Sequence, residues 1–328
     1  MKKNSMSEHF KERFGGNVEE FSLTPPLPSS LNLELNNTCN QKCFFCPFHG
    51  EYAKHKVKNA VMDKERAKTI LAHAANVGIG RKELGLYLAG EAFLYKDLAE
   101  IIAYAKDLGF PYIFLTSNGV LADLEKMKRL IDAGLDSIRF SINAADRETY
   151  RIYHGTDHFD VVKENIKRLN DYIKDNDKNI ITSISCVLTK ETLGTKERFS
   201  KEFSEYVDEI VFFPLSLSRM VDDTSIKAKY AIQSMEEAEI DPEYVCPLLF
   251  NTMYINAEEW VVPCCEAYDT MFAFGKLDAS CNFEEIWNNK LYQWYRSIFV
   301  NKEPDNGTIC HNCQLRRGGL ESQILLDD

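Results

Sequence analysis

Three cysteines lie close together near the start of the chain, in the run Cys39-Asn40-Gln41-Lys42-Cys43-Phe44-Phe45-Cys46. Thiolates at this spacing can ligate three irons of a cubane iron–sulfur cluster and leave the fourth iron open, because the run lacks a fourth cysteine. An open position on a metal is where chemistry takes place. Zinc would need a fourth ligand, which His49 could supply. The spacing therefore predicts a metal centre and favours the open cluster.

A second group of cysteines is spread over the C-terminal part of the chain. Cys310 and Cys313 form a CxxC pair, and Cys246 and Cys264 bracket a predicted hairpin. Four thiolates give a metal a closed shell of ligands, which suits structural zinc as well as a [4Fe-4S] cluster. Cys186 alternates with apolar residues in a predicted strand and is expected in the core.

The first cysteine run must be held by regular structure, and strands and helices alternate from Leu31 onward. Six strands are predicted, at Leu31–Asn36, Glu83–Gly90, Pro111–Ser117, Asp136–Asn143, Ile180–Thr189 and Glu209–Ser216. Helical spacing separates them, for example after Asp63, a predicted N-cap. Six such units predict a parallel sheet, either an open, partial (β/α)6 TIM-like barrel or a doubly wound sheet. In both folds the active site lies at the carboxyl ends of the strands, where the cysteine run begins.

Two of the predicted strands alternate between apolar and polar side chains. Their apolar sets are Leu31, Leu33 and Leu35, and Ile138, Phe140 and Ile142; their polar sets are Asn32, Glu34 and Asn36, and Arg139, Ser141 and Asn143. The apolar sets are expected to face the helices. The polar sets would then line an interior that holds a polar ligand, or would pair locally, for example Glu34 with Arg139.

Changes in pattern along the chain predict three parts: an N-terminal arm over 1–30, the barrel over 31–238 and a small α+β domain over 239–328. The last part contains a hairpin of Thr252–Asn256 with Glu259–Val262. It also contains one amphipathic helix, Phe283–Phe299, whose apolar stripe is Ile286, Trp287, Leu291, Trp294 and Ile298.

The overall charge excludes some functions. The 328 residues include 39 basic and 50 acidic side chains, for a net charge of −11, and such a surface repels nucleic acid. The N-terminal residues 1–16 lack the apolar core of a signal peptide, and no apolar run is long enough to cross a membrane. We therefore expect a cytoplasmic protein whose cysteines are reduced.

The CxxxCxxC run, with Phe45 just before its last cysteine, resembles the radical S-adenosylmethionine (radical SAM) superfamily. Three later strand ends resemble it too, with Ala89-Gly90-Glu91, then Ser117-Asn118-Gly119, then Ser141 and Asn143. Ala89 and Ala92 depart from the Gly and Pro of the family's Gly-Gly-Glu-Pro-like motif. The resemblance covers residues 31–216 and implies a partial barrel.

The same resemblance implies a set of site residues. The SAM-binding [4Fe-4S] cluster would be ligated by Cys39, Cys43 and Cys46. S-adenosyl-L-methionine itself would be contacted by Phe45, Gly90, Glu91, Ser117, Asn118, Ser141 and Asn143.

The C-terminal cysteines resemble those of SPASM and twitch accessory domains. The layout Cys-x17-Cys, then Gly275-Lys276-Leu277, a Trp287-Asn288 helix and a final CxxC is typical of these domains, which carry auxiliary clusters. The resemblance implies an auxiliary [4Fe-4S] cluster, as in the one-cluster twitch form, with zinc as the alternative. Its ligands would be Cys246, Cys264, Cys310 and Cys313.

The resemblance also implies a reaction. An electron from a donor such as flavodoxin or ferredoxin would cleave SAM to a 5′-deoxyadenosyl radical, which abstracts a hydrogen atom from the substrate. An auxiliary cluster that accepts the second electron favours two-electron dehydrogenation. The single auxiliary cluster and the short segment before the first strand favour a small polar, sugar- or aminocyclitol-like substrate, as in the 2-deoxy-scyllo-inosamine dehydrogenase group.

Other residues and reactions remain open at this stage. Arg219, Arg139 and Glu34 are candidates to bind the substrate or move its proton. Cys265 or Cys281 could return a hydrogen atom in an epimerase, although both could equally be bystanders. A maturase acting on a ribosomal peptide and a simple iron–sulfur electron carrier are further alternatives.

Overall fold

The computed structural model describes residues 9, 21–50, 58–215, 229–230, 232, 241, 243–267, 270–313 and 316. Ser216 and Arg219 therefore lie outside the described residues. The described strands form one sheet and are β1 (Ser30–Leu33), β2 (Glu83–Gly85), β3 (Ile113–Ser117), β4 (Ser137–Ser141), β5 (Ile181–Leu188), β6 (Glu209–Pro214), β7 (Thr252–Ile255), β8 (Trp260–Val262) and β9 (Gly275–Lys276).

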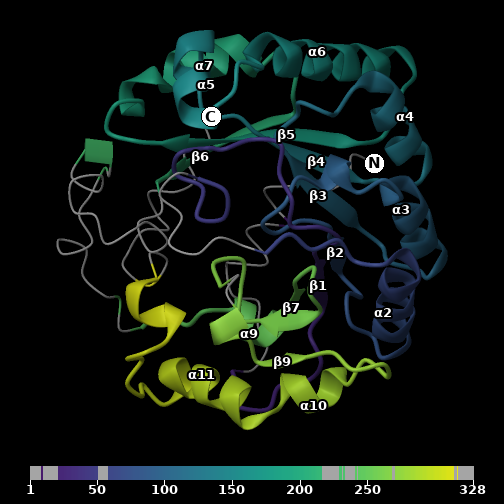
Figure 1. Cartoon of the computed structure of the whole chain (residues 1–328), viewed down its shortest axis with the longest axis vertical. Coiled ribbons are helices and arrows are strands. Elements are labelled where there is room, and N and C mark those ends of the chain that lie inside the picture. The colour runs from purple at the N-terminus through teal and green to yellow at the C-terminus, as the bar shows by residue number, and fades with distance from the viewer. Residues whose placement is uncertain are drawn as a thin grey trace.

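The order of the strands identifies the architecture. The sheet runs β6-β5-β4-β3-β2-β1-β7-β8-β9, and β1 to β6 pair in parallel with their sequence neighbours. A doubly wound sheet reverses its strand order at a switch point, whereas β1 to β6 follow each other without reversal. The described sheet also has open edges at β6 and β9 (Figure 1). The prediction of an open, partial barrel is thus confirmed.

Helices cover the outer face of the sheet (Figure 1). The α-helices are α2 (Lys64–Asn76), α3 (Leu98–Asp107), α4 (Leu124–Asp132), α5 (Arg147–His154), α6 (Phe159–Asp175), α7 (Lys196–Phe203), α9 (Leu248–Asn251), α10 (Phe283–Trp287) and α11 (Lys290–Val300). Short 3₁₀ turns occur at Ala92–Leu94, Leu193–Thr195, Thr270–Phe272 and Ile309–Asn312. The predicted N-cap is confirmed, because the Asp63 side chain accepts a hydrogen bond from Arg66 N at 3.0 Å.

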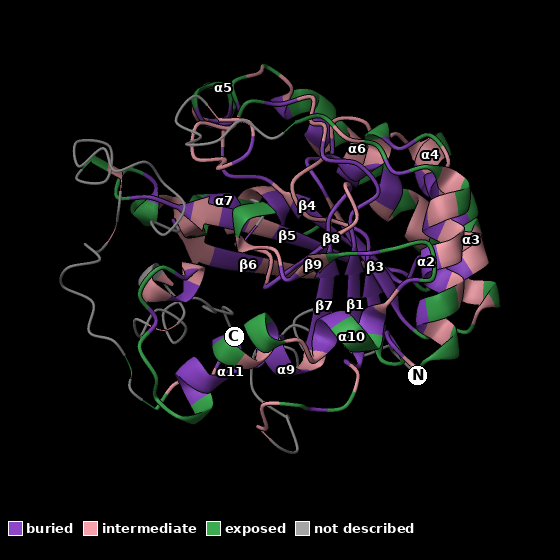
Figure 2. Ribbon diagram, turned by 60° about the horizontal axis from the view of Figure 1, so that its bottom comes forward, coloured by how far each residue is buried: buried purple, intermediate pink, exposed green. Residues whose placement is uncertain are grey.

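The main core lies between the sheet and its helices (Figure 2). The predicted apolar sets of β1 and β4 belong to it: Leu31, Leu33, Leu35, Ile138, Phe140 and Ile142. The buried residues Val162, Ile166 and Leu169 of α6 belong to the same core. Cys186 is buried in the same core, as expected.

The first two strands are shorter than predicted. β1 ends at Leu33 and β2 at Gly85, because side chains of the β1 segment replace the backbone ladder beyond these points. Asn32 Nδ2 donates to the carbonyl oxygen of Tyr87 at 2.5 Å, and Asn36 Nδ2 donates to that of Glu91 at 3.0 Å. The segment after β2 is therefore held at the barrel mouth without strand geometry.

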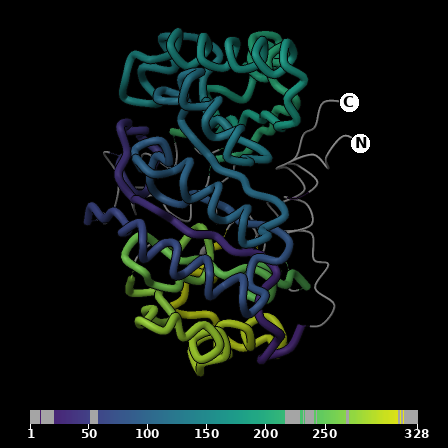
Figure 3. Tube along the Cα trace, turned by 90° about the vertical axis from the view of Figure 1, so that its right-hand side faces the viewer, coloured from purple at the N-terminus to yellow at the C-terminus, as the bar shows by residue number. Residues whose placement is uncertain are grey.

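The C-terminal module continues the barrel sheet and lies at one end of the molecule (Figure 3). Its first strand, β7, pairs in parallel with β1, and β7 and β8 form the predicted antiparallel hairpin. The single helix predicted over Phe283–Phe299 is wrong. Asn288 ends α10, and Asn289 caps α11 by accepting from Tyr292 N at 2.9 Å.

This break rotates the face that α11 turns to the core. Leu291 and Trp294, placed in the predicted apolar stripe, are 36% and 38% exposed, whereas Tyr292 and Tyr295 are buried. Within the part of the chain that the structure describes, no helix combines the length and apolar character needed to cross a membrane.

Candidate active site and auxiliary cysteine site

The loop that carries Cys39, Cys43 and Cys46 follows β1 and is fastened to the end of α5. Lys42 N donates to His154 O at 3.3 Å, and Phe44 N donates to Tyr153 O at 3.1 Å. Gly155, the C-cap of α5, has a φ of 65°, and a Cβ there would lie 2.9 Å from Lys42 O. A residue without a side chain is therefore needed where the loop crosses the helix end.

The three thiols of this loop lie close enough to influence one another. Burial raises the pKa of Cys43 well above the ordinary value, and the charges of Cys46 and Cys39 add to this effect. Burial likewise raises the pKa of Cys39 to about 11. Gathering three partly buried thiolates is unfavourable unless a cation compensates them, which is what a metal centre supplies.

The Gly90–Glu91 segment and the end of β3 are joined beside this loop. Glu91 is fully buried and accepts hydrogen bonds from Ser117 Oγ and Asn118 N, both at 2.7 Å. Burial raises its pKa, while these bonds oppose the shift. Asn118 Nδ2 donates to Asn40 Oδ1 at 2.7 Å and Glu91 N donates to Thr38 O at 2.8 Å, so the Gly90–Glu91 segment and the end of β3 meet the cysteine loop.

The end of β4 reaches the same region through Asn143. Its Oδ1 accepts from Val187 N at 2.8 Å, and its backbone N–H donates to His154 Nε2 at 3.1 Å. Ser141 is half-buried in β4. Phe45 packs with Phe44 and Tyr153, with ring centroids 5.0 Å and 6.2 Å away. All seven predicted SAM-contacting residues therefore lie on segments around one mouth of the barrel.

Glu34 has a different environment from the one expected of a substrate ligand. Its carboxylate accepts from the backbone N–H groups of Ala89 at 2.6 Å, Gly90 at 3.2 Å and Ala257 at 3.0 Å. Burial raises its pKa to about 7, and these bonds oppose the shift. Glu34 thus ties the Gly90 segment to the turn of the β7–β8 hairpin.

Arg139 and Cys281, two other candidates for a role at the substrate, lie in different parts of the molecule. Arg139 is buried inside the barrel, with Nε 3.4 Å from Ser183 Oγ. Cys281 is buried beside α2, where its Sγ is 3.4 Å from Arg66 Nη1. The structure therefore does not bring Cys281 to the cysteine loop after β1.

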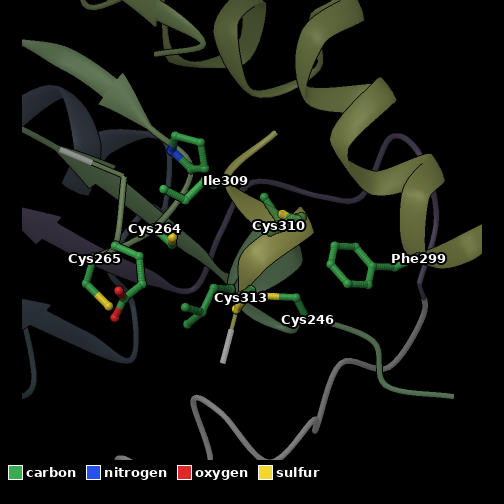
Figure 4. A pocket seen from close by; sticks show the side chains of 11 residues that line it. Cys246, Cys264, Cys265, Phe299, Ile309, Cys310 and Cys313 are labelled. Carbon is green, nitrogen blue, oxygen red and sulfur yellow. The ribbon is translucent and has the colours of Figure 1, made fainter. Parts of the chain in front are cut away.

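A second group of thiols surrounds a cavity in the C-terminal module. Figure 4 shows Cys246, Cys264, Cys310 and Cys313 around this cavity, with Cys265 on its wall but apart from them. Cys246 and Cys310 are buried. Burial raises the pKa of Cys310 far above its ordinary value, and the charges of Cys246, Cys313 and Cys264 raise it further. The four predicted ligands are thus brought together.

Two models of known protein families match the parts of the chain that carry the two cysteine sites. The model of the radical SAM superfamily matches residues 33–201, just over half of the chain. The chain belongs to this superfamily. A second model, described as an iron-sulfur cluster-binding SPASM domain, matches residues 246–314. Radical SAM and SPASM domains together imply a SAM-binding [4Fe-4S] cluster and an auxiliary cluster.

Curated relatives are similar in sequence to part of this chain. A probable GTP 3′,8-cyclase of Saccharolobus islandicus is 36% identical over 157 residues, which are 48% of this chain and 45% of the relative. The chain thus spans less than half of that relative's length. A probable GTP 3′,8-cyclase of Saccharolobus solfataricus is 27% identical over 267 residues, 72% of this chain and 78% of the relative.

Solved structures share the fold at low identity. Streptococcus suis SuiB bound to the precursor peptide SuiA has a TM-score of 0.63 and 16% identity, covering 89% of this chain and 71% of its own. Native anSMEcpe with bound AdoMet has a TM-score of 0.62 and 16% identity, covering 88% of each chain. BtrN with AdoMet and 2-DOIA has a TM-score of 0.51 and 15% identity, covering 83% of this chain and 87% of its own.

The radical SAM site fits the cluster that the family implies. Its three thiols are the ligands that iron–sulfur clusters use, and backbone N–H groups already point at two of them. Gln41 N lies 3.5 Å from Cys39 Sγ, and His49 N lies 3.4 Å from Cys46 Sγ. Such donors stabilise sulfur ligands that carry negative charge.

The auxiliary site fits an iron–sulfur cluster through two tyrosines besides its thiols. The buried hydroxyl of Tyr244 lies within hydrogen-bond reach of Cys246, and that of Tyr292 is buried without a hydrogen-bond partner among the described residues. Both pKa values are raised, chiefly by burial, and the nearby charges of Cys246 and Cys264 contribute. A thiolate that ligates a metal is a stronger hydrogen-bond acceptor for such hydroxyls than a neutral thiol, so a bound cluster would give both tyrosines a good partner.

Sequence reasoning missed two buried residues of the radical SAM site that contact each other, Gln41 and His154. Gln41 stands inside the cysteine run but is no metal ligand. His154 follows the run by more than 100 residues and reaches it only because α5 folds back over the loop. Burial lowers the pKa of His154 to about 3, so its imidazole is neutral at ordinary pH. Its position at the end of a polar helix offered no signal.

Proposed function

We propose that this radical SAM protein dehydrogenates a small polar, sugar- or aminocyclitol-like substrate by two electrons. The observation that carries the proposal is the set of four thiols around one cavity, two of them buried, in a module that extends the barrel sheet through β7. When bound, the SAM cluster supplies the electron that cleaves SAM, and the auxiliary cluster takes the electron that the substrate radical loses. The substrate radical also loses one proton and becomes a ketone or imine.

The chain's own residues have separate tasks in this proposal. Cys39, Cys43 and Cys46 hold the SAM cluster, and the segments around Gly90, Asn118 and Asn143 hold SAM at the barrel mouth. The polar barrel interior, which includes Arg139, binds the substrate and keeps water from the radical.

Glu34 has a positioning role in this scheme, because both its carboxylate oxygens accept from backbone amides. It holds the Gly90 segment and the hairpin turn at Ala257 in place, which leaves substrate binding to other groups.

Anaerobic reconstitution and turnover test the proposal. The reconstituted protein should contain about eight irons per chain, from two four-iron clusters. With SAM, a one-electron reductant and a panel of aminocyclitols and amino sugars, it should form 5′-deoxyadenosine and an equal amount of an oxidised product. Cys310→Ala should retain cleavage of SAM but lose the oxidised product. Four irons with one zinc per chain would refute the auxiliary role.

A GTP 3′,8-cyclase activity is the second candidate, because curated relatives with 36% identity over 157 residues bear that name. Incubation with GTP under the same conditions distinguishes the two functions. Consumption of GTP coupled to 5′-deoxyadenosine, without turnover of the amino sugars, would favour the cyclase.

Epimerisation and peptide maturation lead to other products. An epimerase would leave deuterium from D₂O at an inverted carbon without net oxidation. The positions of Cys281 beside Arg66 and of Cys265 on the wall of the auxiliary cavity give this reaction no support. Peptide maturation would require turnover of a ribosomal peptide. The similarity to SuiB, at 16% identity, extends only to the fold.

A further inference from the structure

A buried histidine stands directly beside one thiol of the radical SAM loop. His154 is 1% exposed, and its Nδ1 lies 3.4 Å from Cys43 Sγ and 2.9 Å from Gln41 Oε1. On the other edge of the ring, Nε2 accepts from the backbone N–H of Asn143 at 3.1 Å. The ring therefore bridges the cysteine loop and the end of β4.

These contacts determine which nitrogen carries the hydrogen. A backbone N–H can only donate, so the Asn143 amide requires a lone pair on His154 Nε2. In a neutral imidazole the hydrogen then resides on Nδ1. The two neighbours of Nδ1, Gln41 Oε1 and Cys43 Sγ, are both able to accept it. The tautomer thus places one hydrogen between Gln41 Oε1 at 2.9 Å and Cys43 Sγ at 3.4 Å, where both share it.

The surrounding groups hold the ring in this orientation. Tyr150 stacks on His154 with ring centroids 4.1 Å apart and planes 14° from parallel. Gln41 Nε2 donates to Tyr150 Oη at 2.6 Å, which turns Gln41 Oε1 toward the histidine. The carbonyl of His154 also accepts from Lys42 N, so ring and loop cannot move apart independently.

We propose that His154 is a positioning residue whose Nδ1–H donates a hydrogen bond to the Cys43 thiolate and raises the reduction potential of the SAM cluster. The proposal rests on the proposed ligation of that cluster by Cys43. Reduction adds negative charge that is shared with the sulfur ligands, and a donor to one of them stabilises this charge. Because the donor is neutral and fixed, it favours the reduced state without opposing the binding of iron.

Two substitutions separate the donor from the ring. His154→Phe retains the flat ring that stacks on Tyr150 but has no N–H. His154→Asn loses the ring but places an amide N–H near the position of Nδ1. Tyr153→Phe is the matched control, because it keeps the ring that packs on Phe44 in the same helix and removes only a hydroxyl bonded to Thr189 Oγ1.

The potential of the SAM cluster is measured by EPR-monitored redox titration of the reconstituted holoenzyme, with the signal identified by its response to SAM. His154→Phe should lower the equilibrium constant for reduction about tenfold, which is about 59 mV for one electron. His154→Asn and Tyr153→Phe should stay near the wild-type potential, and the potential of the auxiliary cluster should not shift. A wild-type potential in His154→Phe with full iron content would overturn the proposal.

A second measurement needs no change to His154. Pulsed EPR of wild-type protein labelled with ¹⁵N at histidine Nδ1 should reveal a coupling between the reduced SAM cluster and one nitrogen. The coupling should persist in His49→Gln, which removes the other histidine next to the loop. A reduced cluster without any ¹⁵N coupling would refute the hydrogen bond. Absence of the cluster itself would instead refute the proposed ligation.

Discussion

The Gly90→Ala substitution tests whether the Gly90–Glu91 segment must approach the β1 segment as closely as the structure indicates. A Cβ on Gly90 would come 2.8 Å from Asn37 Cα and closer still to the carbonyl oxygen of Asn36. Both neighbours are backbone atoms, which cannot rotate away. Gly90 is not among the described glycines with positive φ, so alanine suffers only from these contacts.

The size of the effect follows from overpacking. Real Cβ atoms stay at least 3.0 Å from such neighbours, so the two segments must separate by several tenths of an ångström. Forced repacking of this kind costs about 1–3 kcal/mol. The melting temperature should therefore fall by about 3–10 °C. If the strain is relieved by displacing the Gly90 amide, affinity for SAM should fall by a factor of about 5–150.

Two assays read these effects, namely differential scanning fluorimetry of the reconstituted protein and equilibrium binding of SAM. The matched control is Gly194→Ala, since a Cβ on Gly194 would have no neighbour within 4 Å and its φ is also not positive. Gly194→Ala should behave as wild type. Equal melting temperatures and equal SAM affinities for Gly90→Ala and Gly194→Ala would refute the close approach.

Three further predictions concern buried polar groups. The pKa of Glu34 is raised from 4.5 to about 7 in the folded protein. In chemical denaturation, the free energy of unfolding of the wild type, measured relative to Glu34→Gln, should therefore fall by about 3 kcal/mol as the pH rises from 4.5 through 7. A difference between the two proteins that does not change with pH would contradict this. Arg296→Met should lower the free energy of unfolding by about 2–5 kcal/mol in the same assay, because the fully buried Arg296 donates to the backbone carbonyls of Leu249 and Leu23. Tyr244→Phe with Tyr292→Phe should lower the auxiliary-cluster potential in protein without the SAM cluster, whereas a wild-type value would exclude their hydrogen bonds.

Much of the fold could be predicted because local pattern and tertiary contact agree in it. The alternation around Phe140 and the N-cap at Asp63 depend on neighbours within a few residues, and both are confirmed. The cysteine sets were also visible in sequence, since metal ligands must recur at fixed spacing. The Gly90–Glu91 segment could be assigned to the site only through the family resemblance, because a glycine after a strand most often marks a turn.

The errors occur where a distant contact overrides the local pattern. The apolar spacing over Phe283–Phe299 suits one helix, but Asn289 Nδ2 donates to Phe274 O at 2.8 Å and its Oδ1 caps α11. The helix therefore restarts with a new phase. The contact of His154 with Cys43 could not be predicted for the same reason, because the two residues are 111 positions apart in the sequence. Such contacts depend on the packing of whole elements, which no local window contains.

The β1 segment links the two sites physically, because its side chains act where the backbone ladder has ended. β1 lies between β2, which leads to the Gly90 segment, and β7, which begins the auxiliary module. Glu34 accepts from Gly90 on one side and from Ala257 on the other. A carboxylate that satisfies buried amides of two modules cannot lose one set without leaving polar groups unpaired, at about 1–3 kcal/mol each. The relative placement of SAM site and auxiliary site is therefore set by the same short strand that delivers the cluster cysteines.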